Sequence, residues 1–149
     1  MGTRLLLAID QDAPGQAAVD FTIDLASTFD SDVYVFHVRE VPSSLGVFPL
    51  ESAGEAQVLV EETVNRLESA GIAAEGEVCS EHKSRVAVLI VEEACKRKCD
   101  VIVLGSLRLR GLKSVIGHGT RERVLKMSSL PVIVTPPASV DLDRNGACP

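Results

Sequence analysis

The chain has 149 residues, of which 46% are hydrophobic and 24% charged, and its formal net charge is −6. This length and balance are typical of one globular domain with its own core, and they exclude a disordered chain, which is poorer in apolar residues. The acidic balance argues against a general binder of nucleic acid or of anionic membranes, because both need a basic face.

The first part of the chain predicts a strand, a helix and a second strand. The continuous apolar run at residues 5–9 is typical of a strand buried on both faces of a parallel sheet. Asp12 and Pro14 mark the start of a helix. The apolar stripe expected along this helix consists of Ala18, Phe21, Leu25 and Phe29. Residues 33–38 are β-branched and aromatic and predict the second buried strand, after which residues 42–49 break the pattern.

The middle of the chain predicts a helix, a weaker strand and a third helix. Apolar residues repeat at helical spacing over 51–70, and Gly71 stands where a helix-ending glycine belongs. Residues 72–79 contain Gly76 and two glutamates, which a strand at the sheet edge tolerates. Ser84 is expected to cap the third helix. That helix ends in a basic cluster that complements its dipole and is interpreted as structural: Lys96, Arg97 and Lys98.

The last third adds a buried strand at residues 101–104, a short helix at 120–128 and a fifth strand at 131–134. We expect residues 1–137 to form one domain and residues 138–149 a flexible tail. Alternating strands and helices predict a doubly wound α/β fold with right-handed crossovers. Ligands of such sheets bind at the carboxyl ends of the strands.

A glycine-rich basic loop follows the fourth predicted strand at that edge. Residues 105–127 hold six of the fifteen basic residues and one of the twenty-one acidic ones. The basic residues are Arg108, Arg110, Lys113, Arg121, Arg123 and Lys126. Glycine amides, guanidinium groups and a following helix N-terminus favour an anion such as phosphate, while Asp10 accepts hydrogen bonds from a ribose or a base. A structural interpretation, with turning glycines and solvated arginines, stays open.

Other motifs of phosphate binding and catalysis are missing from the sequence: there is no GxxxxGK[ST], no GxGxxG after the first strand and no GxSxG. His37 lies in an apolar run and is interpreted as a packed, satisfied histidine, and His82 as a loop residue. His118 lies inside the basic loop and is assigned to binding, because no serine, cysteine or carboxylate is evidently placed to make it catalytic. We therefore expect a binding protein rather than an enzyme.

The four cysteines are interpreted as free thiols, because a chain of this length needs no disulfide framework and their spacings match no zinc finger. Cys95 and Cys99 are four residues apart on the predicted third helix, where two side chains face each other. No apolar run approaches the roughly twenty residues of a membrane span, and the first ten residues do not form a secretion signal. The predicted compartment is the cytoplasm.

Four segments together resemble the universal stress protein family: LLLAID at residues 5–10, the pair His37–Val38, DVIVLGS at 100–106 and SSLPVIV at 128–134. The resemblance implies a five-stranded parallel sheet sandwiched by helices, as in adenine nucleotide alpha hydrolase-like proteins, with strand order 3-2-1-4-5. It also implies binding of ATP or AMP, with Mg²⁺ as a companion ion. It further implies a homodimer formed through the last strand, at Val132, Ile133 and Val134.

The ATP-binding subgroup of that family carries GxxG, nine residues, and then glycine followed by serine or threonine. Gly105 matches the first glycine, but Arg108 replaces the second, and a strict count puts His118 at the third. With a loop one residue longer, Gly119 and Thr120 supply the glycine and the hydroxyl. The arginines then hold an anion by charge where glycine amides would have held it by backbone.

By the family's pattern, Asp10 and its two predecessors line the adenine and the ribose, and Val38 packs on the base. The full set of nucleotide-binding residues implied is Ala8, Ile9, Asp10, Val38, Leu104, Gly105, Arg108, Gly111, His118, Gly119, Thr120 and Arg121.

Three functions follow as hypotheses. The first is a dimeric stress-response protein that binds an adenine nucleotide and acts as a sensor or partner-binding module. The second is the same fold acting only through protein contacts, with Arg108 and His118 occluding the site. The third is a phosphoryl-accepting receiver domain, suggested by Asp10 and Asp12, although an aspartate after the third strand and a lysine after the fourth or fifth are missing.

Overall fold

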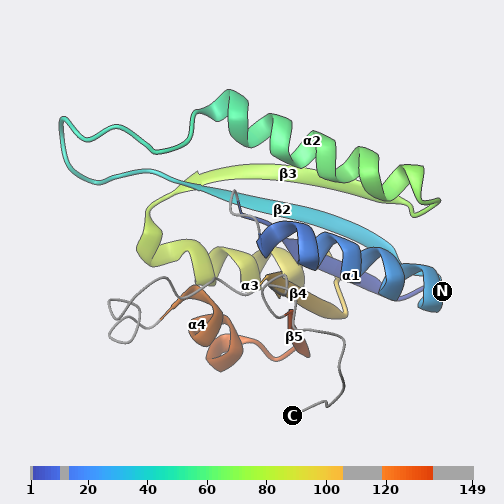
Figure 1. Cartoon of the computed structure of the whole chain (residues 1–149). Coiled ribbons are helices and arrows are strands. Elements are labelled where there is room, and N and C mark those ends of the chain that lie inside the picture. Colours follow the sequence, from blue (N-terminus) through green and yellow to red (C-terminus); the bar gives the residue numbers. More distant parts are fainter. Residues whose placement is uncertain (1, 11–13, 106–118, 136–149) are drawn as a thin grey trace, which may run out of the picture.

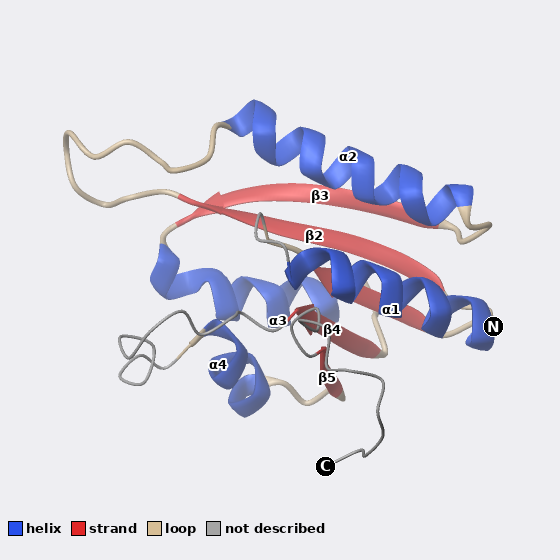
Figure 2. Ribbon diagram, viewed as in Figure 1, coloured by secondary structure: helices blue, strands red, loops and turns tan. Residues whose placement is uncertain are grey.

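The computed structural model of the chain describes residues 2–10, 14–105 and 119–135. These residues form a twisted sheet with helices on both faces (Figures 1 and 2). The strands are β1 (Arg4–Ala8), β2 (Asp32–Glu40), β3 (Ala74–Glu81), β4 (Val101–Gly105) and β5 (Val132–Thr135). The helices are α1 (Pro14–Phe29), α2 (Ala53–Ser69), α3 (Val86–Lys96) and α4 (Thr120–Met127), with a 3-10 turn, η1 (Lys83–Arg85), before α3. The predicted tail lies outside the described residues.

All four strand pairs are parallel, and the strand order is β3-β2-β1-β4-β5. This confirms the predicted doubly wound sheet, its order and the position of the third strand at an edge. The register pairs Ala8 of β1 with Phe36 of β2 on one side and with Leu104 of β4 on the other. Strands β1 and β4 are therefore the central pair, where the winding of the chain reverses direction.

The core is divided by the sheet into two layers, as expected from strands buried on both faces. Leu5 and Leu7 of β1 pack with α1 and α2, whereas Leu6 packs with α3 and α4. Successive side chains of a strand point to opposite faces, so each face receives alternate residues of one continuous apolar run. Within the described residues, no helix is both long enough and apolar enough to cross a membrane.

The predicted apolar stripe of the first helix is partly wrong. Phe21 and Phe29 are exposed on α1. The residues that α1 buries are Ala18, Val19, Thr22 and Ala26. Two alanines on this face allow close packing of the helix on the sheet, and the Thr22 hydroxyl is satisfied because it donates to the carbonyl of Ala18 at 2.7 Å. The buried stripe is rotated away from the aromatic side chains.

The start of the third helix also differs from the prediction. Ser84 lies inside η1 and does not cap α3, which begins at Val86 after an Arg85 that makes no side-chain capping bond. The capping side chain is His82, whose Nδ1 accepts a hydrogen bond from the backbone N–H of Ser84 at 3.3 Å. The extra 3-10 turn satisfies backbone groups that the serine was expected to satisfy.

Cys95 and Cys99 do not share a helix, contrary to the prediction. Helix α3 ends at Lys96, and Lys98 adopts a positive φ of 55° that turns the chain away. Cys95 is exposed, whereas Cys99 is buried. Burial raises the pKa of the Cys99 thiol to about 11, so this thiol stays protonated near neutral pH. The two thiols therefore lie in different environments and do not face each other across a helical turn.

Candidate functional site

The carboxyl ends of β1 and β4 form the central feature of the candidate site. Ala8 and Leu104 lie directly opposite each other in the register, and Gly105 ends β4. The N–H of Ile9 continues the pairing toward β2 by donating to the carbonyl of Phe36 at 3.0 Å. From these ends the chain leads to α1 on one face and to α4 on the other. Doubly wound sheets bind their ligands at this position.

Burial divides the predicted residues at this edge into two kinds. Ile9 and Leu104 are buried, Ala8 and Gly105 are half-buried, and Asp10 is exposed. The strand ends are thus lined by apolar residues, and the first polar side chain after β1 is the carboxylate of Asp10. Oxygens of this carboxylate are suited to accept hydrogen bonds from sugar hydroxyls.

Val38 lies in the core beside this edge. It is 8% exposed and belongs to the layer that also contains Leu104 and Val124 of α4. The family's pattern implies that this side chain packs on a base. The structure places most of the valine within the protein core, so it contributes an apolar wall and little free surface.

The N-terminus of α4 supplies donors for an anion. Gly119 is the N-cap and makes no side-chain capping bond, and Thr120 and Arg121 in the first turn are half-buried. The N–H groups of a first helical turn and the helix dipole both favour a negative charge. Val124, packed in the same layer as Leu104, ties this helix to the α3 side of the sheet.

One basic residue of the predicted loop region has a structural partner. Arg123 donates through Nη1 to the carbonyl of Ser84 at 2.7 Å, which joins α4 to η1. Arg108, Gly111 and His118 lie outside the described residues, as does Asp12. The described part of the predicted set therefore occupies four places: the end of β1, Val38 on β2, the end of β4 and the start of α4.

His37 is a buried, satisfied histidine, as predicted, but its partner was not anticipated. Its Nδ1 lies 2.8 Å from the carbonyl oxygen of Ile9, and its Nε2 lies 2.8 Å from Oε2 of Glu51. The sequence suggested only that Glu51 begins a helix. In the structure it precedes the N-cap Ser52 and is buried beside the candidate edge. No local sequence pattern indicated this burial, because the partner His37 is fourteen positions away.

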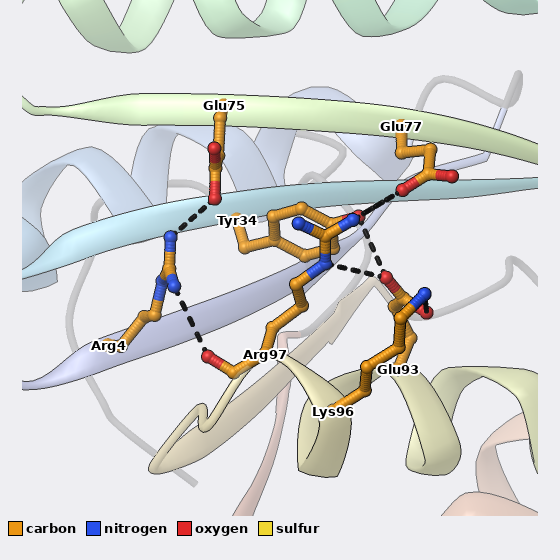
Figure 3. A network of polar contacts seen from close by, with 7 residues as sticks. All are labelled: Arg4, Tyr34, Glu75, Glu77, Glu93, Lys96 and Arg97. Carbon is orange, nitrogen blue, oxygen red and sulfur yellow. Dashed lines mark hydrogen bonds and ion pairs between the residues drawn. The ribbon is translucent and has the colours of Figure 1, made fainter.

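A second polar network lies near the amino ends of the strands (Figure 3). The hydroxyl of Tyr34 is 2.9 Å from carboxylate oxygens of both Glu77 and Glu93. The guanidinium group of Arg97 stacks over the Tyr34 ring, with Cζ 4.6 Å from the ring centroid. It also donates hydrogen bonds to the same two carboxylates. Arg4, the first residue of β1, joins the network through Glu75 and the Arg97 carbonyl. These contacts support a structural role for Arg97, as predicted for the basic cluster.

Comparison with known proteins gives consistent matches over almost the whole chain. The profile described as the universal stress protein family matches residues 1–136. A universal stress protein of Methanocaldococcus jannaschii is 30% identical over 137 residues, which cover 88% of this chain and 80% of that protein.

Two solved structures show the same fold. A universal stress protein family member from Burkholderia pseudomallei superposes with a TM-score of 0.73 at 21% identity, covering 91% of this chain and 96% of that one. The universal stress protein of Archaeoglobus fulgidus in complex with dAMP superposes with a TM-score of 0.64 at 22% identity, covering 89% of this chain and 96% of that one.

Proposed function

The chain belongs to the universal stress protein family, and from this premise we propose that it binds ATP or AMP at the carboxyl edge of β1 and β4. We further propose that it acts as a cytoplasmic sensor or partner-binding homodimer. The observation that carries the proposal is the pairing of Ala8 with Leu104, next to Asp10. Family membership also replaces the receiver-domain hypothesis.

The donors and acceptors at this edge fit the parts of a nucleotide. The Asp10 carboxylate accepts hydrogen bonds from ribose hydroxyls, and the first-turn N–H groups of α4 donate to phosphate oxygens. Arg121 adds positive charge at the same helix terminus. Relatives solved with cAMP, with dAMP and, from Arabidopsis thaliana, with AMP support an adenine nucleotide as the ligand.

Mg²⁺ is proposed only as a companion of ATP. Residues 2–10, 14–105 and 119–135 bring no three His, Cys, Asp or Glu side chains together in a metal-binding group. Mg²⁺ in nucleotide sites takes many of its ligands from phosphate oxygens and water. In this proposal the nucleotide is a bound ligand and takes part in no catalytic step.

Isothermal titration calorimetry with AMP and with ATP, each with and without Mg²⁺, tests the proposal. We expect saturable binding that the variant Asp10→Ala weakens by about tenfold or more, because a charged hydrogen-bond partner is lost. Asp24→Ala, which changes an exposed aspartate on α1, is the matched control and should bind like the unchanged protein. Absence of binding at millimolar nucleotide overturns the proposal.

The second candidate function is action through protein contacts alone. It is favoured by Arg108, which replaces a glycine of the family's phosphate loop, and by apolar side chains that solvent reaches between β2 and α2. These side chains are Leu45, Val47, Phe48 and Leu50. Under this alternative both nucleotides leave the thermal unfolding temperature unchanged, since only a bound ligand shifts it.

A further inference from the structure

A buried histidine and a buried glutamate meet next to the proposed nucleotide edge. His37 of β2 is 2% exposed, and the side chain of Glu51, which precedes α2, is 8% exposed. Their Nε2 and Oε2 atoms are 2.8 Å apart. The other ring nitrogen, Nδ1, is 2.8 Å from the carbonyl oxygen of Ile9. One imidazole therefore links the end of β1 to the segment that enters α2.

The partners of the ring determine its proton count. A carbonyl oxygen only accepts hydrogen bonds, so the Ile9 contact requires a proton on Nδ1. The contact between Nε2 and the Glu51 carboxyl group requires a second proton, carried either by the ring or by the carboxyl group. In both arrangements His37 and Glu51 together hold one proton more than a neutral histidine beside an ionised glutamate. Without that proton, one ring nitrogen turns a lone pair toward an oxygen, either the Ile9 carbonyl or the Glu51 carboxylate.

The surroundings of Glu51 favour the neutral arrangement, in which the proton is on the carboxyl group. Its second oxygen, Oε1, is buried and has no hydrogen-bond partner in the part of the chain that the structure describes. Burying an unpartnered charged oxygen costs more than burying an unpartnered carbonyl oxygen. Nearby charged groups are Arg39, which donates from Nε to the Glu51 backbone carbonyl, and Asp10, which follows Ile9. Glu55 in α2 is engaged by Ser52.

Glu51 lies near the end of the segment between β2 and α2, which projects beyond the sheet (Figure 1). Residues 41–50, the apolar loop, contain no charged side chain and expose Leu45, Val47, Phe48 and Leu50. Arg39, which lies in β2 two residues before the loop, donates from Nε to the Glu51 carbonyl at 2.8 Å, so the residues that flank the loop meet at Glu51. The geometry at Glu51 therefore fixes where this loop leaves the protein.

We propose that His37 and Glu51 form a latch, closed by one shared proton, that positions the Ile9–Asp10 end of β1 against the base of the apolar loop. The two residues are positioning residues, because His37 contacts the Ile9 backbone and neither of them is proposed to contact a ligand. The part of this inference that concerns ligand affinity rests on the proposed function. The shared proton and the position of the loop do not depend on it.

The proton count is tested on the unchanged protein without nucleotide, by ¹⁵N NMR of its histidine side chains. We expect His37 to carry a proton on Nδ1 and to show a second, slowly exchanging proton in the Nε2–Glu51 hydrogen bond. The variant His37→Gln assigns the signals. A ring that is unprotonated at Nδ1, or that lacks the second proton near neutral pH, overturns the latch.

Two substitutions of Glu51 test the positioning role. Glu51→Gln keeps the shape and supplies an amide N–H that donates to Nε2, so the latch stays closed without the shared proton. Glu51→Leu removes the bond. We expect AMP affinity to fall by about tenfold in Glu51→Leu and to change by less than about twofold in Glu51→Gln. Glu62→Leu, at an exposed position of α2, is the matched control.

Hydrogen exchange of the apolar loop and the amide chemical shift of Asp10 are measured on the same variants without nucleotide. Both should change in Glu51→Leu and be restored in Glu51→Gln. Equal behaviour of the two variants, or unchanged exchange and shift in Glu51→Leu, overturns the positioning role. If the unchanged protein binds no AMP, the proposed function fails, and these ligand-free measurements still decide whether the latch exists.

Discussion

Tyr34 lies between two carboxylates, so the folded protein holds the proton of its hydroxyl more strongly than the unfolded chain does. Burial first, and then the hydrogen bonds and charges of Glu77 and Glu93, raise the pKa of this phenol above its usual range. An unfolded tyrosine loses its proton near pH 10, where the folded protein still retains it. The contribution of Tyr34 to the free energy of unfolding is therefore fully present below about pH 10 and is lost as the pH rises further.

The variant Tyr34→Phe keeps the ring beneath Arg97 but removes the hydroxyl. We expect its free energy of unfolding to be lower by about 1–3 kcal/mol at neutral pH, because two carboxylates lose a partner. We also expect a smaller loss of stability above about pH 10 than in the unchanged protein. Urea unfolding at several pH values measures both effects. Parallel alkaline curves for the two proteins would contradict the assigned role of the hydroxyl.

Glu93 of the same network predicts the opposite pH dependence. Burial alone would raise the pKa of this carboxyl group, but hydrogen bonds from Arg97 and Tyr34 outweigh it and lower the pKa. The unfolded chain then takes up this proton first as the pH falls. The contribution of Glu93 is present above the usual glutamate pKa of about 4.3 and is lost as the pH falls through the lower folded value.

Glu93→Gln should therefore show a shallower acid loss of stability than the unchanged protein, measured by urea unfolding between neutral pH and about pH 3. The neighbouring Glu92→Gln is the matched control, since Glu92 is exposed on the same helix. We expect the acid limb of that control to match the unchanged protein. An equally shallow limb in both variants would assign the effect to net charge.

Gly76 of β3 is required for the packing of α2 on the sheet. A Cβ atom at this position would lie 2.5 Å from a methyl carbon of Val60 and 3.1 Å from the Val35 carbonyl oxygen. Gly76→Ala should lower the free energy of unfolding by about 1–3 kcal/mol, as overpacking does. Gly54→Ala in α2 meets nothing closer than 3.9 Å and should be neutral or stabilising. Equal thermal unfolding temperatures in both variants would contradict this account.

Individual residues show which parts of the site could be predicted from sequence. Asp10 and Gly105 each follow an apolar run, and the two runs form parallel strands, so the sequence alone predicts that both residues lie at the same edge of the sheet. The burial of Glu51 depends on a hydrogen bond to His37, fourteen positions away, which no local pattern indicates. The sequence indicates Gly76 only as an interruption of a strand, because no pattern in the neighbouring residues predicts that α2 packs against this position.

At the scale of elements, the ends of α2 and α3 share one motif with different residues. After α2 the positive-φ residue is Gly71, with φ of 80°, and after α3 it is Lys98, with φ of 55°. In both, the next residue donates back across the turn: Ile72 to the Leu67 carbonyl and Cys99 to the Ala94 carbonyl. Glycine adopts this conformation without the strain that a side chain brings.

Lys98→Gly should therefore raise the free energy of unfolding by about 1 kcal/mol, because it removes a left-handed residue that carries a Cβ atom. The reciprocal variant Gly71→Lys should lower it by a similar amount. Differential scanning calorimetry of the two variants measures the pair of shifts. Reversed shifts, with stability lost in Lys98→Gly and gained in Gly71→Lys, would show that the lysine charge, rather than the backbone, controls these helix ends.

The elements differ in how well the sequence defines them. Buried parallel strands are marked by continuous apolar runs, so the positions of β1, β2 and β4 were predicted to within two residues at each end. Strand β3 lies two residues later than expected because its alternation is weak. The start of α3 was wrong because a histidine cap and a 3-10 turn satisfy the same backbone groups that a serine cap satisfies.

At the scale of the whole molecule, the fold explains why the two polar groups of residues have separate roles. The network around Tyr34 lies toward the amino ends of the strands, where it joins β2, β3 and α3. The candidate site lies at the carboxyl ends of β1 and β4, on either side of which α1 and α4 pack on opposite faces of the sheet. Substitutions in the Tyr34 network should therefore change stability with little effect on nucleotide affinity, as expected for sites that share no partner.

The proposed homodimer is a property of the whole molecule that depends on one sheet edge. Strand β5 is the last strand of the sheet, so one side of its backbone has no partner strand within the described residues. Val132 and Ile133 are half-buried, and Val134 is 37% exposed. An apolar edge strand of this kind invites pairing with a second chain.

Val134→Lys should convert the dimer to a monomer in size-exclusion chromatography with light scattering, because a buried interface tolerates an unpaired charge poorly. Val58→Lys is the matched control, since Val58 is exposed on α2, away from β5, and its variant should remain dimeric. A monomeric mass for the unchanged protein would contradict the proposed dimer. Dissociation of both variants alike would show that the added charge, and not the β5 edge, separates the chains.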